Sequence, residues 1–387
     1  MKKIQDVQVS GKKVLVRVDY NVPIKNGLIT DNERIVASLE TINYLMGHGA
    51  AIILCSHLGQ PEGRPNPLYS LKPVAAELGN LINKSVQFSG DCLGKERGQK
   101  VSELKPGEIL LLENIRFYPG EEKNDPNFAA DLAEGCDLFV NDAFSVSHRE
   151  HASVIAVTKY LDSFAGLFLQ KEFQNLSRIV FDPKRPFFLV LGGAKITDKI
   201  QFLNNLMDRI DTLILGGAVA NTFLLAKGNK IGQSIAEAEL VSLVRDLLEM
   251  TENRNIKVFL PEDVIVANSI NDIAGQPKLL NQISDHEVIL DIGESTIAQY
   301  SSAVEFAETI FWNGPMGLSE TPAFARGTKL MGQAIANTSA FSVIGGGDTV
   351  ASLDSATRSQ FDYVSMAGGA SLKFLSDVNL PGLVVLQ

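Results

Sequence analysis

The sequence predicts an α/β protein with two Rossmann-like domains, each a parallel sheet covered by helices, joined by a connecting helix with a hinge cleft. Three observations support this fold class. The chain has 387 residues, which favours two domains over one. Apolar runs of strand length alternate with longer helical patterns. The runs are almost continuous in Val, Ile and Leu, which is typical of parallel strands buried on both faces.

The strand-like runs follow one another along the whole chain, at residues 14–19, 51–57, 108–114, 137–144, 186–193, 211–217, 257–267, 287–293, 309–314, 341–350 and 362–369. Between the two halves, residues 164–183 show helical spacing that Asp182-Pro183 ends. This stretch is either the connecting helix or one more helix that covers a sheet. Ligands of parallel sheets bind beyond the carboxyl ends of the strands, so the residues after each run are informative.

Composition excludes several classes of protein. The chain is 45% hydrophobic and 21% charged, and it has no apolar run of about 18 residues, so we expect no membrane span. No secretory leader is recognisable. Cys55, Cys92 and Cys136 are far apart and lack C-x-x-C spacing, which fits a reducing cytoplasm and disfavours a zinc site. The net charge of -10 argues against general nucleic-acid binding.

The runs of the first half are followed by polar and charged side chains, namely Asp19, Asn21, Arg34, His57, Asn114, Arg116, Asn141, Asp142, His148 and Arg149. Arginines and histidines at neighbouring strand ends suit a small, strongly anionic ligand. The runs of the second half are followed by glycines, at 192–193, 216–217, 314, 345–347 and 368–369. Glycines let the backbone approach a base and a polyphosphate. One half for a small anion and one for a nucleotide indicates a two-substrate kinase.

Two stretches of the second half carry specific hypotheses. In FSVIGGGDTV (341–350) a strand runs into glycines, where Asp348 is well placed for Mg²⁺ on bound phosphates. The alternative is a tight turn with Asp348 as a helix cap. In LGGAKITDKI (191–200) we expect a helix bearing Lys195 and Lys199 on one face, where bound phosphate would offset the unfavourable helix dipole. The alternative is a solvated pair of lysines.

Several familiar signatures are missing. No stretch matches a P-loop, G-x-S-x-G, H-E-x-x-H or the protein-kinase motifs. A nicotinamide dehydrogenase should show G-x-G-x-x-G in its first strand-to-helix turn, and this chain does not. A two-lobed solute-binding protein would share the hinge but has no need of Lys195 or Asp348.

Nine motifs read together give a family resemblance. In chain order they are RVDYNVP (17–23), DNERI (31–35), SHLGQP (56–61), LLENIRF (111–117), VNDAFSVSHR (140–149), LGGAKITDKI (191–200), WNGPMGLSE (312–320), FARGTK (324–329) and GGGDTVA (345–351). With the final LPG (380–382), this pattern resembles the phosphoglycerate kinase family over essentially the whole chain.

The resemblance implies a monomeric, cytoplasmic glycolytic enzyme that moves a phosphoryl group reversibly from 1,3-bisphosphoglycerate to ADP with Mg²⁺, giving 3-phosphoglycerate and ATP. By similarity the phosphoglycerate site comprises Asp19, Asn21, Arg34, His57, Gln60, Arg116 and Arg149. The nucleotide and transfer residues are Lys195, Lys199, Glu320, Gly346, Gly347, Asp348, Thr349, Gly368 and Gly369. We expect a phosphoglycerate-binding domain at 1–166 with a returning tail at about 371–387, a connecting helix at 167–183 and a nucleotide-binding domain at 184–370.

The expected reaction does not need the catalytic motifs that are missing from the sequence. The nucleophile in the ATP-consuming direction is a carboxylate, already ionised at neutral pH, so no general base is needed. Rate must come from in-line positioning, domain closure and charge neutralisation.

Four positions depart from the family pattern. Gln60 stands where the family has arginine, Ala367 replaces a glycine, Glu294 replaces a proline and Lys373 replaces an acidic residue. Loss of the arginine predicts weaker phosphoglycerate binding, unless Arg64 substitutes for it. A kinase homologue that binds ligands without turnover is therefore the main alternative function.

Overall fold

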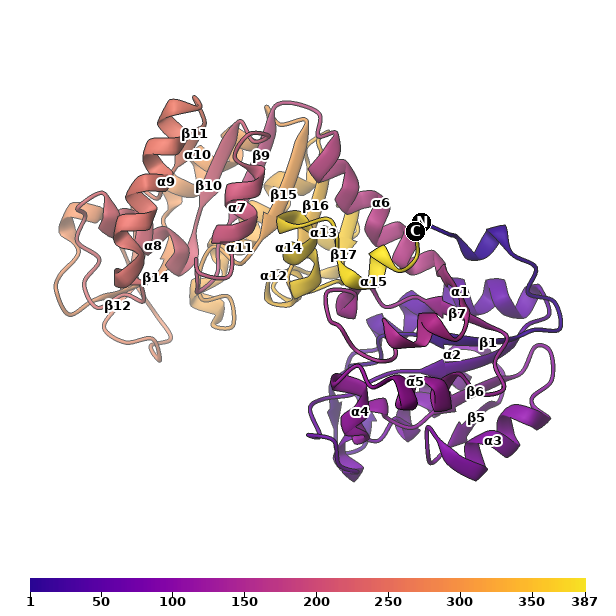
Figure 1. Cartoon of the computed structure of the whole chain (residues 1–387). Helices are drawn as coiled ribbons and strands as arrows, with labels where there is room; N and C mark the ends of the chain where they lie inside the picture. Colours follow the sequence, from indigo (N-terminus) through magenta and orange to yellow (C-terminus); the bar gives the residue numbers. More distant parts are fainter. The chain divides into compact units, whose positions relative to one another are not determined.

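The computed structural model describes residues 1–387, which divide into two compact units (Figure 1). Unit 1 comprises Met1–Gln174 and Asn379–Gln387, and unit 2 comprises Asn175–Val378. The division falls within helix α6 (Leu167–Phe181), which confirms the predicted helix and its end before Asp182-Pro183. Which residues act together as functional domains, with the predicted bounds at 166, 183 and 370, remains a prediction.

The sheet of unit 1 has six strands, all parallel, in the order β5 (Val86–Ser89), β6 (Ile109–Leu112), β4 (Ala51–Cys55), β1 (Lys13–Arg17), β7 (Leu138–Asn141) and β8 (Asp162–Ala165). Side chains alternate across a strand, and both faces are buried here. Val14 and Val16 belong to one core cluster and Leu15 to the other. Apolar cover on both faces explains why the run at 14–19 is continuously apolar rather than alternating.

The covering helices of unit 1 are α1 (Glu33–Gly47), α2 (Lys72–Ile82), α3 (Gly94–Glu103), α4 (Pro119–Glu122) and α5 (Pro126–Ala133), and a two-stranded hairpin is formed by β2 (Ile24–Lys25) and β3 (Leu28–Ile29). The two chain ends lie side by side in this unit, where Lys2 N donates to Leu386 O at 2.6 Å (Figure 1). The final helix α15 (Pro381–Val384) is held by a bond of 2.8 Å from Gly382 N to Ser147 O.

Unit 2 contains a second parallel sheet, in the order β11 (Lys257–Phe259), β10 (Thr212–Leu215), β9 (Phe187–Leu191), β15 (Thr309–Asn313), β16 (Phe341–Gly345) and β17 (Tyr363–Ser365). Trp312 packs in the core with residues of α10 (Glu294–Val304) and α11 (Arg326–Ala336). Its neighbour Phe311 points the other way and meets Phe202 of α7 (Ile200–Leu206) edge-on. Helices therefore cover both faces of this sheet too, as the fold class predicts.

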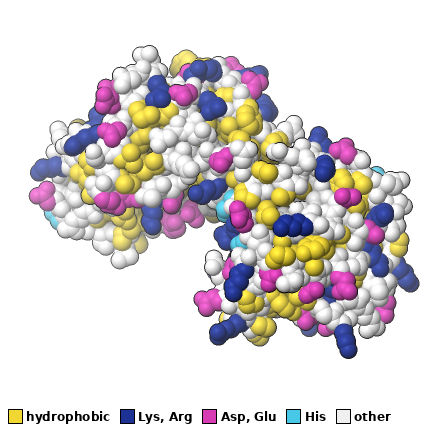
Figure 2. Space-filling model, viewed as in Figure 1, with side chains coloured by type: hydrophobic (Ala, Val, Ile, Leu, Met, Phe, Trp, Pro, Cys, Tyr) yellow, Lys and Arg dark blue, Asp and Glu magenta, His cyan; other side chains and the backbone are white.

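The remaining helices of unit 2 are α8 (Gly217–Ala226), α9 (Val241–Asn253), α12 (Gly347–Ala351), α13 (Ser355–Arg358) and α14 (Gly369–Ser376). None of the helices in the structure combines the length and apolar character that crossing a membrane requires. On the face shown in Figure 2, acidic and basic side chains are interspersed over both units.

One part of unit 2 differs from the predicted pattern. The run 257–267 is two strands, β11 and β12 (Asp263–Ala267), and β12 leaves the parallel sheet. It pairs antiparallel with β13 (Gln276–Leu279) and with β14 (Val288–Ile292) in a separate three-stranded sheet. The physical reason lies between the strands, where Pro261 has no N–H to continue a ladder. The strands β5, β8 and β13 were not predicted, and β13 is mostly exposed.

Candidate active site

In each parallel sheet, the order in which the chain adds strands reverses at an inner strand. In unit 1 the chain passes from β1 outward through β4 and returns to β7 on the other side of β1. In unit 2 it passes from β9 through β10 and returns to β15 on the other side of β9. Crevices beyond the carboxyl ends of the strands form at such switch points, and most of the predicted site residues lie there.

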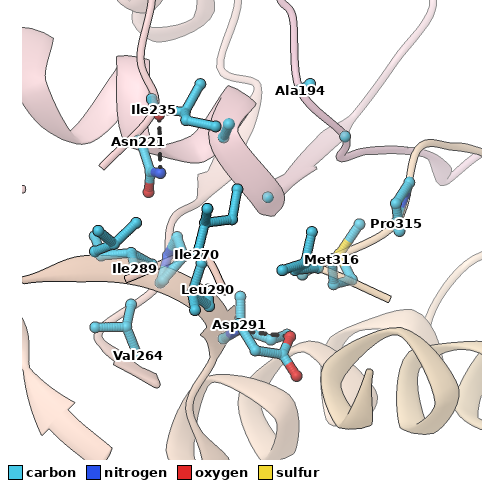
Figure 3. Close-up of a pocket in the computed structure, with 18 of the residues that line it drawn as sticks. Ala194, Asn221, Ile235, Val264, Ile270, Ile289, Leu290, Asp291, Pro315 and Met316 are labelled. Carbon is cyan, nitrogen blue, oxygen red and sulfur yellow. Dashed lines mark hydrogen bonds between the residues drawn. The ribbon is translucent and has the colours of Figure 1, made fainter. Parts of the chain in front are cut away.

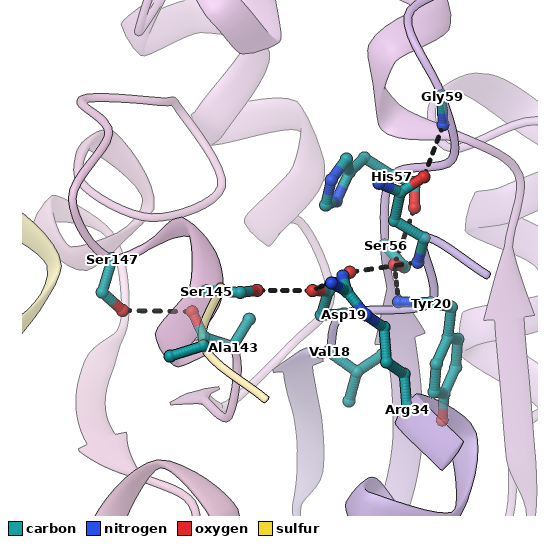
Figure 4. A network of polar contacts seen from close by, with 12 residues as sticks. Val18, Asp19, Tyr20, Arg34, Ser56, His57, Gly59, Ala143, Ser145 and Ser147 are labelled. Atoms are coloured by element: carbon teal, nitrogen blue, oxygen red, sulfur yellow. Dashed lines mark hydrogen bonds and ion pairs between the residues drawn. The ribbon is translucent and has the colours of Figure 1, made fainter. Parts of the chain in front are cut away.

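Asp19, just after β1, is the centre of a polar network in unit 1 (Figure 4). Its Oδ2 accepts hydrogen bonds from Arg34 Nη1 and Ser145 Oγ, and its Oδ1 accepts from Asn21 N at 3.0 Å. Burial alone would raise the pKa of Asp19, but positive neighbours, Arg34 among them, and the hydrogen bonds lower it. The carboxylate is thus ionised, and it fixes the direction of the Arg34 guanidinium.

A second pair of buried residues lies beside this network. Arg17 ends β1 and is fully buried, with Nε donating to Ser153 Oγ at 2.9 Å and Nη2 lying 3.2 Å from His57 Nδ1. Burial holds the pKa of His57 well below its ordinary value, and Arg17 and Arg116 add to this effect. The imidazole is therefore neutral at pH 7 and can act as a hydrogen-bond partner without adding charge.

Arg116 contacts the loop after β4, which also carries Gln60. Arg116 is 4% exposed, its Nη1 donates to Gly59 O at 2.8 Å, and its Nη2 has no hydrogen-bond partner within the structure. Asn21 Oδ1 accepts from Gly59 N at 2.9 Å, so this loop joins both residues. Gln60 is exposed on the same loop. A buried guanidinium with a spare donor is suited to an anionic ligand.

The lowered pKa of His151 reflects its burial and the positive charge of this site. Burial lowers the pKa of His151 to about 3, and Arg17, Arg116, Arg149 and His148 all contribute. Arg149 is partly exposed on the loop that follows β7. The structure therefore brings Asp19, Asn21, Arg34, His57, Arg116 and Arg149 into one strongly cationic region of unit 1.

Unit 2 holds a cavity of about 170 Å³ beyond β9 and β15 (Figure 3). Its wall is mainly aliphatic, and its polar members include Asn221, Asp291, Glu320 and Asp348. Glycine is required where its backbone segments meet, because a Cβ on Gly192 would lie 2.1 Å from Pro315 O. An apolar cavity with a few polar groups at its edge is the usual form of a small-molecule site.

The two predicted lysines lie near this cavity but not on a helix. Helix α7 begins only at Ile200, so Lys195 and Lys199 occupy the preceding turn, which corrects the expected helical pair. The helix does not begin earlier because the N–H groups of Ile196 and Thr197 bond to the Glu237 carboxylate and not to backbone carbonyls of a preceding helical turn. Lys195 is exposed. Lys199 is 7% exposed with Nζ 3.2 Å from Lys195 O, and burial lowers its pKa.

The glycine-rich loop after β16 has the predicted strand, glycine and helix order. Gly346 adopts φ +95°, and α12 begins at Gly347. Asp348 is exposed and lines the cavity, whereas Thr349 is buried and its Oγ1 accepts from Gly314 N at 2.8 Å. Gly368, at φ +56°, precedes α14, and a Cβ on Gly368 or Gly369 would meet nothing within 4 Å. The space beside the Cα atoms of both glycines is therefore open to a ligand.

Sequence reasoning missed some residues of both sites. Arg17 could have been found, because it is the one charge inside the apolar run VLVR, and Ser145 lies inside a quoted motif. No pattern in the sequence pointed to Glu237 or Asp291. Burial raises the pKa of Asp291 to about 7, although its carboxylate accepts from Ile292 N and Gly327 N.

A parallel-sheet unit with a cationic site and a second one with an apolar, glycine-edged cavity flanked by lysines define a kinase of small molecules. Comparison with known proteins gives the family. This chain belongs to the phosphoglycerate kinase family, whose model matches residues 4–377. The resemblance drawn from its motifs is thereby confirmed.

Curated relatives and solved structures agree over the full length. The phosphoglycerate kinase of Moorella thermoacetica is 46% identical over 385 residues, covering 99% of this chain and 98% of the relative. That of Thermus thermophilus is 46% identical over 391 residues, covering all of both chains. The structure of the Coxiella burnetii phosphoglycerate kinase matches with a TM-score of 0.89 at 40% identity, covering 99% of this chain and 98% of that one. The Pyrococcus horikoshii enzyme matches at 0.88 and 32%, covering 100% and 98%.

Proposed function

We propose that this protein catalyses the glycolytic transfer of a phosphoryl group between 1,3-bisphosphoglycerate and ADP, giving 3-phosphoglycerate and ATP. The single observation that carries the proposal is the family match over residues 4–377. The cationic site of unit 1 and the cavity of unit 2 supply one site for each substrate.

The phosphoglycerate is assigned to unit 1. Arg34, Arg116 and Arg149 bind its phosphate and carboxylate oxygens, because guanidinium groups form paired, charge-assisted bonds to such anions. Asp19 orients Arg34 and Asn21 supports the Gly59 loop. Neutral His57 donates or accepts one hydrogen bond. Gln60 contacts the ligand without the charge that the family usually has there.

The nucleotide is assigned to unit 2. The base enters the apolar cavity, Glu320 binds the ribose, and Lys195 and Lys199 bind phosphate oxygens. The amides of Gly346 and Gly347, with Thr349, border the same phosphates.

Mg²⁺ fits Asp348. This carboxylate is exposed at the edge of the cavity, and no group of three or more His, Cys, Asp or Glu side chains in the structure forms a metal cage. Mg²⁺ usually combines one or two carboxylates with substrate phosphates. When bound, the ion neutralises phosphate charge.

The reaction requires positioning rather than acid-base chemistry. The carboxylate of 3-phosphoglycerate attacks the γ-phosphorus of ATP, the bond from that phosphorus to the β,γ-bridging oxygen breaks, and ADP leaves. Arg34, Lys195 and Lys199 neutralise the transferred group, with the amides of Gly368 and Gly369. We also propose that the two units close around the substrates, because closure excludes the water that would hydrolyse the acyl phosphate.

We further propose that the enzyme works as a monomer in the cytoplasm. Three free cysteines, two of them buried, support a reducing compartment. Light scattering at micromolar concentration tests the oligomeric state, and a dimer would overturn that part.

The decisive experiment is a turnover assay with ATP, Mg²⁺ and 3-phosphoglycerate, coupled to NADH oxidation by a dehydrogenase that consumes 1,3-bisphosphoglycerate. We expect robust activity that is lost in Arg34→Ala and Lys195→Ala variants with unchanged circular dichroism. ATP binding without turnover would instead support the alternative of a non-catalytic homologue, for which Gln60 and Ala367 are the specific reasons.

A further inference from the structure

The turn that carries Lys195 and Lys199 is held by hydrogen bonds to one carboxylate, that of Glu237, which lies about 40 residues further along the chain. Glu237 Oε2 accepts hydrogen bonds from Ile196 N and from Thr197 N, the latter at 3.2 Å, and its Oε1 accepts from Thr197 Oγ1. The Ile196 side chain is fully buried, so the turn is fixed on its other side by packing. Burial would raise the pKa of Glu237, but these hydrogen bonds lower it, and the group is a carboxylate at neutral pH.

The segment that presents Glu237 is itself anchored to helix α8. Asn221 Nδ2 donates to Ile235 O at 3.1 Å, and Glu237 N donates to Thr222 Oγ1 at 3.1 Å. Asn221 and Thr222 are consecutive and both are buried, so α8 fixes both ends of residues 235–237.

The same short segment also reaches the cavity. Ile235 and Asn221 are part of the cavity wall, and Figure 3 shows their hydrogen bond beside the other lining side chains. Ile235 is 53% exposed. A ligand in the cavity would cover it, while Glu237, two residues further on, holds the lysine turn.

We propose that Glu237 is a positioning residue for the nucleotide phosphates, and that residues 235–237 couple the filling of the apolar cavity to the geometry of Lys195 and Lys199. This inference rests on the proposed function, in which the cavity takes the base and the lysines take the phosphates. Glu237 touches no substrate in this scheme and acts only through the turn.

Glu237 acts by limiting the conformational freedom of the lysine turn. Lysine side chains are flexible, and ordering them for a phosphate costs conformational entropy. A turn with three hydrogen bonds to one carboxylate limits the backbone freedom at the base of both side chains, so less is lost when the ligand binds. A glutamine in place of Glu237 offers the Ile196 and Thr197 N–H groups one neutral oxygen, so the charge-assisted bonds weaken and the turn can take other conformations.

The test compares a ligand that has phosphates with one that has none. Calorimetry measures the dissociation constants of Mg-ADP and of adenosine for wild type and Glu237→Gln, and the turnover assay gives kcat and both KM values. We expect Glu237→Gln to weaken Mg-ADP binding about tenfold and to lower kcat severalfold. Adenosine binding and the KM for 3-phosphoglycerate should stay within twofold of wild type.

Two further variants sharpen this test. Thr197→Val removes only the hydroxyl donor and should give an intermediate loss for Mg-ADP. Glu239→Gln removes the same charge two residues away, where Glu239 is exposed, and should leave both dissociation constants, kcat and both KM values unchanged.

The outcomes separate the two proposals. Unchanged Mg-ADP affinity in Glu237→Gln, or an equal loss for adenosine and Mg-ADP, would overturn the positioning role. Absence of turnover in wild type would overturn the proposed function, while the ratio of the two affinities would still decide the role of Glu237.

Discussion

Arg17 Nη2 lies 3.2 Å from His57 Nδ1, and both side chains are buried at the carboxyl ends of neighbouring strands. The guanidinium also donates through Nε to Ser153 Oγ, whose hydroxyl donates to Glu121 Oε1 at 2.7 Å. Glu121 is fully buried as well. A chain of buried polar groups thus supports the substrate site from behind, and each member depends on its neighbours for satisfaction.

Replacement of Arg17 should therefore affect both stability and substrate binding. Arg17→Met keeps much of the side-chain volume but removes every donor, leaving a buried glutamate with less compensation. We expect a loss of about 3 kcal/mol in unfolding free energy, together with a raised KM for 3-phosphoglycerate and an unchanged KM for ATP. Urea denaturation and steady-state kinetics measure the two effects. A fully stable variant with wild-type KM would show that the chain of contacts is dispensable.

Gly59 links two substrate-site residues through its backbone, and we expect Gly59→Ala to be damaging. Its φ is +60° and an added Cβ would lie 2.3 Å from Tyr69 Cε1. Gly11→Ala is the matched control, since Gly11 has φ +71° and nothing within 4 Å of the added Cβ. The control should cost about 1 kcal/mol from backbone strain. Gly59→Ala should cost about 1–3 kcal/mol more and raise the KM for 3-phosphoglycerate. Equal stability losses would contradict the predicted clash.

His151 should make stability fall towards acid pH. Its pKa is about 3 in the folded protein and near ~6.5 in an unfolded chain, so the unfolded state binds the proton more readily. This contribution is present above about pH 6.5 and is lost as the pH falls towards the folded pKa. Compared with His151→Asn, wild type should lose unfolding free energy between pH 7.5 and 5. Parallel curves in urea titrations would show that burial does not suppress protonation there.

Asp291 should have the opposite dependence. Its pKa is raised to about 7 in the folded protein but is near ~3.9 in an unfolded chain. The stability it contributes is therefore present at low pH and is lost as the pH rises through about 7. The difference in unfolding free energy between wild type and Asp291→Asn should shrink from pH 5 to 7.5. A difference that stays constant over this range would mean that the carboxylate is ionised throughout it.

The sequence was sufficient for the fold because its strands are continuous apolar runs, and a strand such as β1 is buried on both faces. It also predicted that polar side chains and glycines gather at strand ends, because they stand out against those runs; their roles as site residues stay a prediction. The conformation of the Lys195–Lys199 turn was not predictable, since it depends on Glu237, about 40 residues away. The antiparallel sheet was missed for a different, local reason. The run 257–267 reads as one strand until the missing N–H of Pro261 is weighed.

The Arg17–Ser153–Glu121 contacts illustrate a second limit. Each member is a common residue type, and only tertiary packing makes a buried arginine and a buried glutamate neighbours of one serine. Spacing along the chain, which is 136 residues between Arg17 and Ser153, carries no such information.

Gln60 offers the most direct test of the phosphoglycerate site. It follows Gly59, whose carbonyl accepts from Arg116, and it is exposed at the edge of the cationic region. Gln60→Arg would add a charge facing the anionic substrate. A charge-assisted hydrogen bond is worth about 1.5–3 kcal/mol when shielded, and solvent exposure reduces this to about 1 kcal/mol.

The KM for 3-phosphoglycerate should therefore fall roughly fivefold in Gln60→Arg, since about 1.4 kcal/mol corresponds to a factor of ten. Gln60→Met, which has similar length and no charge, is the control and should not lower the KM. The gain should also shrink as ionic strength rises from 0.01 to about 0.2 M, because salt screens exposed charges. An unchanged KM at low salt would mean that position 60 does not face the substrate, and that the charge lost here has no part in binding.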